Sequence, residues 1–239
     1  VRRIKKMVPS YSLPGHLRFS DVLEQGRGQS LAPVPLGPEE IAFLQYTGGT
    51  TGVAKGAMLT QRNMLANLGQ TGTWISTSFR EGAEIVITPL PMYHIFCLTS
   101  TLAYMKWGSL LVIITNPRDL PEMVKELARW RFTVMTGVNT LFNGLLNTPG
   151  FDALDFSALK VVVGGGAAVQ KPVAERWLQV TGRTITEAYG LTEASPGVCA
   201  NPLGMPWNGT IGLPFPSTDV SIRDDGFEEL PVWTGQGDI

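Results

Sequence analysis

The chain has 239 residues, of which 44% are hydrophobic and 16% are charged, and its formal net charge is -1. This composition is typical of an ordered globular protein and excludes a largely disordered chain. The near-neutral charge gives no basic footprint for nucleic acid, and no apolar run reaches the ~18 residues that span a bilayer. The length suits one large domain or two small ones, and we expect no signal peptide.

In chain order, short apolar runs alternate with helical stretches, and Thr60 is the predicted N-cap of a helix that continues to about residue 79. Strands are predicted over residues 41–46, 84–90, 109–114, 132–137, 159–163 and 183–190. Further helices are predicted over residues 95–106, 118–129, 140–147 and 171–180. This alternation, with β-branched strands, predicts an α/β fold built on a mostly parallel sheet flanked by helices.

The style of the sequence changes near residue 197, where Gly and Pro become dense and short alternating stretches such as 218–224 read as strands. We therefore predict an α/β region over residues 1–196 and the start of a small β-rich subdomain over residues 197–239. Neither end of the chain resembles a natural terminus, so we expect both regions to be incomplete. Three Gly-rich segments each follow a predicted strand, and we expect them to line a ligand site at the carboxyl ends of the strands.

The two cysteines, Cys97 and Cys199, have neither CxxC nor metal-binding spacing. They predict reduced, buried thiols in a cytoplasmic protein. Four basic residues stand within the first six positions, which read VRRIKK. We interpret them first as a solvated helix face, and alternatively as a peripheral contact with anionic lipid on the inner face of the membrane.

The first Gly-rich segment, residues 46–56, reads YTGGTTGVAKG. Its glycines free the backbone to turn N–H groups toward an anion, its threonines add hydroxyl donors, and its lysine adds a mobile charge that suits ATP phosphates. It is not the Walker loop, because Gly56 rather than Ser or Thr follows the lysine. A glycine turn with one exposed lysine is the weaker alternative. The predicted phosphate-binding residues are Thr47, Gly48, Gly49, Thr50, Thr51, Gly52 and Lys55.

Residues 187–193 read EAYGLTE and supply the second set of candidates. Tyr189 offers a flat ring for stacking on adenine, Thr192 offers a hydroxyl to a phosphate, and Glu193 is a hard carboxylate that suits Mg²⁺. The glycines at 164–166 allow a flat ring to approach the backbone, and a tight strand-to-helix turn requires them equally. In residues 91–96, PMYHIF, His94 is a candidate near a reactive centre, although a lone His beside aromatics is more often a core residue.

These three motifs, in this order, resemble the signature motifs of the adenylate-forming (acyl-activating) superfamily. The common form of the first motif is YTSGTTGxPKG, and this chain departs from it at Gly48 and Ala54. Segments such as ITNPRDLPEMVKELA, TGVNTLFNGLL and DFSALKVVVGGGAAVQ resemble bacterial long-chain-fatty-acid–CoA ligases. The resemblance extends to about residue 226 and implies the large N-terminal domain of such an enzyme, without its C-terminal domain.

The resemblance also implies roles for individual residues. Catalysis would involve Lys55, Thr192, Glu193 and His94, with Glu193 as the metal ligand. The nucleotide would be held by Thr47 to Gly52, Gly164, Gly165, Gly166, Tyr189 and Gly190. His94 and Phe96 would flank the acyl carboxyl group, and the acyl tunnel would be lined by Gly137, Val138, Asn139 and Thr140.

The implied reaction uses ATP, Mg²⁺ and CoA to activate a fatty acid in two steps, first to acyl-AMP and then to the thioester. The second step would need the absent C-terminal domain, so we expect the chain by itself to be inactive. Relatives include homodimers, and the sequence does not indicate an oligomeric state. Two alternatives stay open: a ligase for a short-chain or aryl acid, and a non-catalytic nucleotide- or lipid-binding module.

Overall fold

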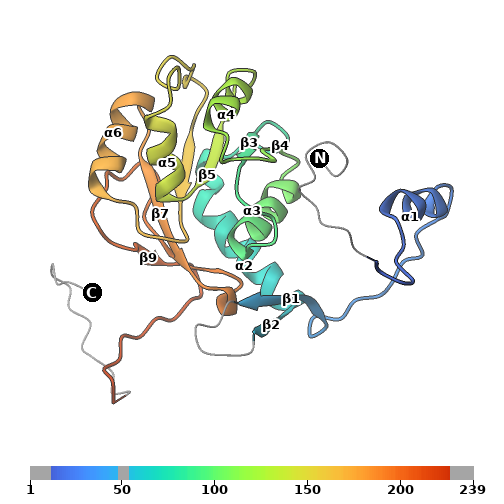
Figure 1. The fold of residues 1–239 in the computed structure, drawn as a ribbon. Helices are drawn as coiled ribbons and strands as arrows, with labels where there is room; N and C mark the ends of the chain where they lie inside the picture. Colours follow the sequence, from blue (N-terminus) through green and yellow to red (C-terminus); the bar gives the residue numbers. More distant parts are fainter. Residues whose placement is uncertain (1–11, 48–53, 227–239) are drawn as a thin grey trace. The chain divides into compact units, whose positions relative to one another are not determined.

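The computed structural model describes residues 12–47 and 54–226 (Figure 1). These residues fall into two compact units that divide between Leu36 and Gly37. In the first unit, helix α1 (Phe19–Gly26) buries none of its residues, and the sequence analysis did not predict it. Within the described residues, no helix has both the length and the apolar character needed to span a membrane. The second unit contains the sheet and the candidate site.

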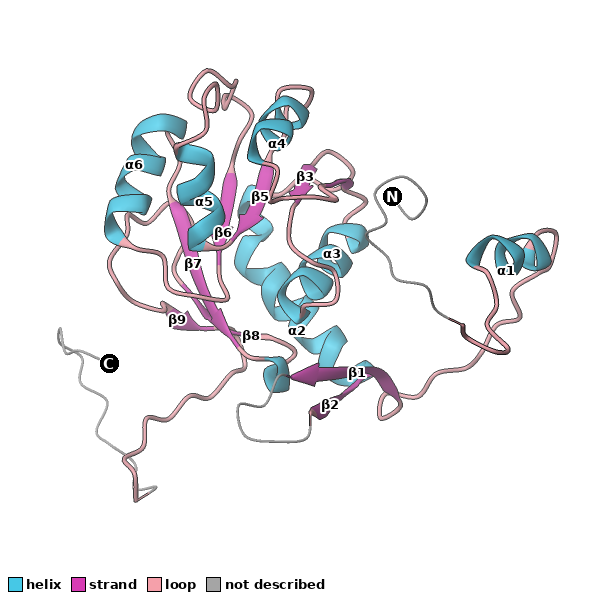
Figure 2. Cartoon of the chain, in the orientation of Figure 1, coloured by secondary structure: helices cyan, strands magenta, loops and turns pink. Residues whose placement is uncertain are grey.

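A seven-stranded sheet forms the centre of the second unit, in the order β4-β3-β5-β6-β7-β8-β9 (Figure 2). The first five strands in this order are parallel to one another. Strand β8 is antiparallel to β7, and β9 is antiparallel to β8. The mostly parallel sheet predicted from the alternating pattern is therefore confirmed. The strands are β3 (Ile85–Thr88), β4 (Leu110–Ile113), β5 (Val134–Gly137), β6 (Val161–Gly164), β7 (Ile185–Gly190), β8 (Gly197–Ala200) and β9 (Leu213–Pro214).

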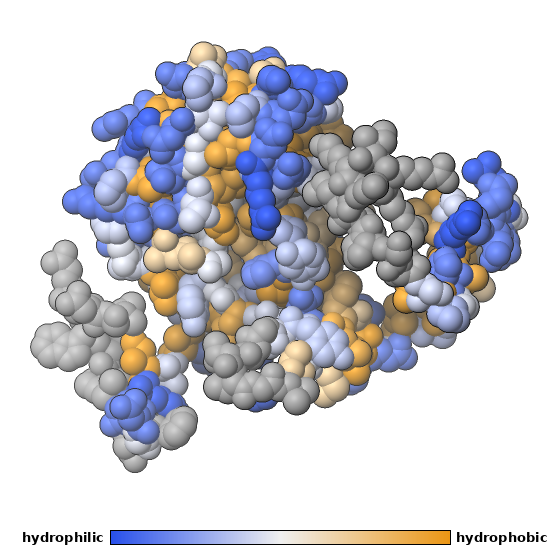
Figure 3. Space-filling view, in the orientation of Figure 1, coloured by the Kyte–Doolittle hydropathy of each residue, from blue (hydrophilic) through white to orange (hydrophobic). Residues whose placement is uncertain are grey.

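Helices cover both faces of this sheet. Successive strand residues point to opposite sides, and apolar residues on both sides pack against helices. In β5, Met135 packs in the core shared with α4 (Leu120–Leu127), α5 (Asn139–Leu146) and α6 (Lys171–Thr181). Its neighbour Val134 packs on the other face, in the core shared with α2 (Gln61–Ile75) and α3 (Ile95–Lys106). The surface over α4 and α6 is mostly hydrophilic, as expected of amphipathic helices (Figure 3).

Local sequence accounts for the helix boundaries. The predicted N-cap Thr60 is confirmed: its hydroxyl accepts from the Asn63 N–H at 3.2 Å, and the Asn63 side chain accepts from the Thr60 N–H at 3.2 Å. Such a capping box satisfies two amides at a helix start. Short 3₁₀ turns extend α2 (Ser76–Ser78) and follow β7 (Thr192–Ala194).

Both cysteines are buried and unpaired.

The predicted strand at residues 41–46 is present as β1 (Ile41–Thr47), but it does not belong to the parallel sheet. It pairs in antiparallel fashion with β2 (Lys55–Thr60), a strand that the sequence analysis missed. The motif KGAMLT is poor in strongly β-forming residues, so only its pairing with β1 identifies it as a strand. The first Gly-rich segment therefore joins two hairpin strands and does not follow a parallel strand.

The chain after residue 197 continues the central sheet through β8 and β9. The stretch 218–224, predicted as a strand, has a single bridge residue at Arg223 and no strand. A period-2 pattern is not sufficient by itself to produce a strand, so that prediction was wrong. The boundary at residues 196 and 197 stays a prediction.

At the amino end of the sheet, the carboxylate of Glu84 is buried (1% exposed) and accepts from Lys160 Nζ at 2.7 Å and from the Arg80 N–H at 2.8 Å. Burial acts to raise the pKa of Glu84, but these hydrogen bonds and one from Thr133 outweigh it and hold the pKa below 4.5. Because Glu84 precedes β3 and Lys160 precedes β6, this ion pair connects the amino ends of the two strands, at the end of the sheet opposite the candidate site.

Candidate active site

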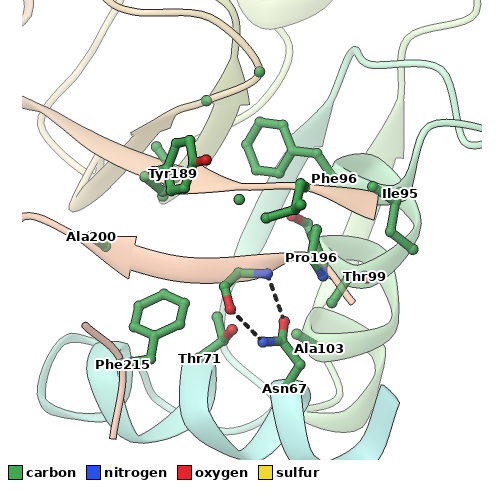
Figure 4. Close-up of a pocket in the computed structure, with 18 of the residues that line it drawn as sticks. Asn67, Thr71, Ile95, Phe96, Thr99, Ala103, Tyr189, Pro196, Ala200 and Phe215 are labelled. Carbon is green, nitrogen blue, oxygen red and sulfur yellow. Dashed lines mark hydrogen bonds between the residues drawn. The ribbon is translucent and has the colours of Figure 1, made fainter. Parts of the chain in front are cut away.

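A cavity of about 500 Å³ lies between the sheet and helices α2 and α3, beside the ends of β7 and β8 (Figure 4). This volume is within the range of small-molecule sites. The sequence-predicted residues that line it are Thr47, His94, Phe96, Gly165, Gly166, Tyr189, Gly190, Thr192 and Glu193. The fold thus brings together residues from four separate segments of the chain, and their chemical roles stay predictions.

The strand β7 ends at this cavity. The 3₁₀ turn that follows it supplies the polar side chains of Thr192 and Glu193 to the cavity wall. Tyr189 lines the cavity and is 46% exposed, so its ring is accessible to a ligand. Thr192 is half-buried and Glu193 is exposed in the turn that follows. Among the described residues, no cluster of three or more His, Cys, Asp or Glu side chains could hold a metal ion. A single carboxylate such as Glu193 nevertheless fits Mg²⁺, which proteins commonly bind through one or two carboxylates together with substrate phosphates.

His94 is an exposed residue at the start of α3 and lies outside the core. Its Nδ1 accepts from the Phe96 N–H at 3.3 Å, which caps the helix and leaves Nε2 available to a ligand. The Phe96 ring lines the cavity (Figure 4). It lies next to Gly165, where an added Cβ would be 3.2 Å from the ring. The start of α3 therefore fixes both side chains at one wall.

The glycines at 164–166 serve different needs. A Cβ at Gly164 would lie 2.8 Å from Ile185 and Val169, so packing inside the fold requires this glycine, and it does not line the cavity. A Cβ at Gly165 would lie 3.2 Å from the Phe96 ring and the Ala188 carbonyl oxygen, at the cavity wall. Gly166 has a φ of 76°, which suits the turn between strand and helix.

Other predicted site residues lie away from this cavity. Lys55 is exposed on β2, where its backbone pairs with Thr47. Gly137 is buried against Phe142, whose ring would lie 2.6 Å from an added Cβ. Asn139 Oδ1 accepts from the Gln170 N–H at 3.0 Å. The predicted tunnel residues Gly137, Val138, Asn139 and Thr140 thus do not line the cavity, and Gly48 to Gly52 lie outside the described residues.

The sequence analysis missed the wall that α2 contributes. Asn67, Thr71 and Trp74 line the cavity at helical spacing on one face of α2. Asn67 is 3% exposed, and its amide donates to the Gly197 carbonyl oxygen at 2.8 Å and accepts from the Gly197 N–H at 3.1 Å (Figure 4). The sequence signal that could have revealed this wall is an Asn on an apolar helix face. A buried amide requires hydrogen-bond partners, so its presence there indicates a specific contact.

Glu187 was also missed, although it belongs to the motif at 187–193. Its carboxylate is half-buried, and it accepts from the Val169 N–H at 2.8 Å. Burial raises the pKa of Glu187 above 4.5, and the hydrogen bond from Val169 offsets only part of that effect. This side chain connects β7 to the segment that follows the glycines at 164–166.

Comparison with known proteins identifies the family. Residues 5–239 match the family of AMP-binding enzymes. The chain is 52% identical over 233 residues to the long-chain-fatty-acid–CoA ligase of Escherichia coli O6:H1, covering 97% of this chain and 42% of the relative. It is also 52% identical to the long-chain-fatty-acid–CoA ligase of Yersinia pestis, again covering 97% of this chain and 42% of the relative.

Among solved structures, ATP-bound MatB from Rhodopseudomonas palustris is similar to this chain, with a TM-score of 0.73 and 25% identity. That similarity covers 88% of this chain and 41% of MatB. The chain therefore spans about two fifths of the length of the relatives that it matches.

Proposed function

The chain belongs to the AMP-binding enzyme family, and on that premise we propose that it forms the ATP- and acyl-binding part of a long-chain-fatty-acid–CoA ligase. The observation that carries the proposal is that residues from all three signature motifs meet at one cavity. The 52% identity to ligases of that name favours a long-chain acid over an aryl or short-chain one.

The nucleotide occupies the end of the cavity at Gly165, Gly166 and Tyr189. There the Tyr189 ring stacks on adenine, and the glycine backbone allows the base to approach closely. Thr192 donates its hydroxyl to a phosphate. The segment from Thr47 to Gly52, together with Lys55, holds the triphosphate.

The fatty carboxylate attacks the α-phosphorus of ATP, forming acyl-AMP and releasing pyrophosphate. His94 and Phe96 hold the carboxyl end of the acid beside the nucleotide. Lys55 neutralises charge that develops on the leaving pyrophosphate, and Glu193 holds Mg²⁺, which supplies further neutralisation when bound. This step needs no side-chain nucleophile. CoA thiol then displaces AMP, and we propose that this second step draws on the rest of the natural polypeptide.

Burial of the acyl chain supplies most of the affinity for the acid. Each methylene removed from water contributes about 0.8 kcal/mol, so a dozen contribute roughly 10 kcal/mol before the costs of ordering. That gradient favours long acids over short ones. A substrate of this kind partitions into lipid, so the proposal includes at most a peripheral contact with the membrane.

Pyrophosphate exchange into ATP tests the proposal directly, because it reports the first step alone. The natural polypeptide carrying this sequence is assayed with acids from acetate to palmitate and with benzoate. We expect activity to rise with chain length, and Lys55→Ala and Glu193→Gln each to lower kcat by about 10²-fold or more. Lys106→Ala, an exposed lysine at the far end of α3, is the matched control and should retain activity.

Exchange with only short or aryl acids would keep the chemistry and overturn the long-chain substrate. Exchange with none of the acids, in protein that binds ATP, would favour a non-catalytic nucleotide-binding module.

A further inference from the structure

The cavity is elongated between two ends, one at the nucleotide-binding residues and one away from them. The strands and helices that line it run from one end to the other. In β7, Thr186 precedes Tyr189, and in β6, Val163 precedes the glycines at 164–166. The later residue in each pair belongs to the nucleotide end. The antiparallel strand β8 starts opposite Gly190, at Gly197, and leads away from it.

Both helices on this face follow the same direction. Ile95 begins the cavity wall of α3 and Tyr104 ends it nine residues later, a rise of roughly 14 Å. Along α2, Asn67 bonds to Gly197 at the start of β8, and Trp74 bonds to Asn201 just after its end. The end of the cavity farther from the nucleotide is thus formed by the ends of α2 and α3.

The lining becomes more apolar along this direction. Beyond Thr71, the far end is lined mostly by apolar and aromatic side chains, namely Trp74, Ile75, Tyr104, Val163 and Leu203, with Thr186 as a polar member. Several of them pack into the hydrophobic core under α2 and α3. An apolar chain that enters past Phe96 therefore finds its matching surface there.

Trp74 is held in place by two contacts. Its Nε1–H donates to the Asn201 carbonyl oxygen at 3.1 Å. Its ring meets the Phe215 ring edge-on, with centroids 5.4 Å apart and an interplanar angle of 60°. Asn201 is itself buried, and its amide donates to the Thr210 carbonyl oxygen at 2.8 Å. A hydrogen-bonded and stacked indole cannot swing aside at low cost, so it forms a fixed boundary.

We propose that the Trp74 indole sets how far an acyl chain can enter the cavity, which makes Trp74 a residue that determines chain-length specificity. This inference rests on the proposed function, since it assumes that the acid enters at Phe96. The two contacts of Trp74 hold its indole in place, and the indole acts only by limiting the space for the acyl chain. It takes no part in the chemical step.

Two substitutions with opposite effects test this boundary in the natural polypeptide. Trp74→Ala removes the boundary, so kcat/KM for the longest saturated acids should rise about tenfold or more relative to shorter ones. Thr71→Leu, one helical turn earlier on the same wall, narrows the cavity and should shift preference toward shorter acids. Trp130→Ala removes a tryptophan that lies outside the cavity lining, and its chain-length profile should match that of the unmodified enzyme.

The readout is the profile of pyrophosphate-exchange kcat/KM against acid length, which a general loss of stability does not tilt. An unchanged profile in the cavity variants of an active enzyme would overturn the role of Trp74 and leave the proposed function standing. If Trp74→Ala does not fold, Trp74→Phe decides, because it places a smaller ring at the same position: a shift toward longer acids supports the boundary, and no shift overturns it. If the unmodified enzyme activates no fatty acid, the proposed function itself has failed.

Discussion

Glu187 is the first residue of the motif that carries Tyr189 and Glu193, and its carboxylate is half-buried. One of its oxygens accepts from the Val169 N–H, and burial raises its pKa above 4.5. A raised pKa means that the folded state disfavours the ionised form relative to the unfolded chain. The resulting loss of stability is present above the folded pKa and disappears as pH falls below the unfolded value of 4.5.

Glu187→Gln should therefore stabilise the protein at neutral pH, because the amide oxygen still accepts from Val169 and carries no buried charge. The gain should shrink toward zero at about pH 4, where the glutamate is largely protonated in both states. Urea unfolding at the two pH values measures the difference. A Gln variant that is less stable at neutral pH would show that the charge has a favourable partner.

Between elements, Asn67 is the main polar connection from α2 to β8, with both of its amide atoms bonded to the backbone of Gly197. Asn67→Ala leaves the N–H and the carbonyl of Gly197 without this partner at a half-buried position. We expect a loss of about 2 kcal/mol in the free energy of unfolding, since an unsatisfied buried group costs ~1–3 kcal/mol. Denaturant titration measures it, and Asn143→Ala, an exposed asparagine on α5, serves as the control.

The same connection supports the site, because Gly197 lies opposite Gly190 in the register of β7 and β8. A destabilised Asn67 variant should therefore also lose nucleotide affinity, measured by calorimetric titration with ATP. A variant with the stability loss and an unchanged affinity would limit Asn67 to a packing role.

Across the whole molecule, stability is expected to be unequal, because α1 buries none of its residues whereas the central sheet is packed on both faces. Segments with few buried contacts open at low cost. Brief trypsin treatment of residues 1–239 should therefore cut after Arg18 and Arg27 before any site within residues 61–200. Arg176, whose guanidinium donates to Leu146 and Asn147, should be among the slow sites. Mass spectrometry of the first products checks the order, and early cuts inside the sheet region would contradict it.

Sequence by itself determined the features that depend on neighbouring residues. The sequence predicted the helix at residues 95–106 with the bounds that the structure has, and Thr60 marked the start of α2 through its cap. The alternation of strands and helices predicted the mostly parallel sheet. The three motifs predicted the nucleotide chemistry, because Gly, Thr, Lys and Glu in that order suit phosphates and Mg²⁺.

Only the tertiary structure decided which segments meet. The pairing of β1 with β2, the antiparallel extension by β8 and β9, and the cavity wall formed by Asn67 and Trp74 all join positions distant in the chain. Strand formation depends on the partner more than on intrinsic propensity, which is why 55–60 was missed and 218–224 was overpredicted. The direction of the cavity likewise follows from long-range packing, since a local pattern gives the face of a helix but not what covers it.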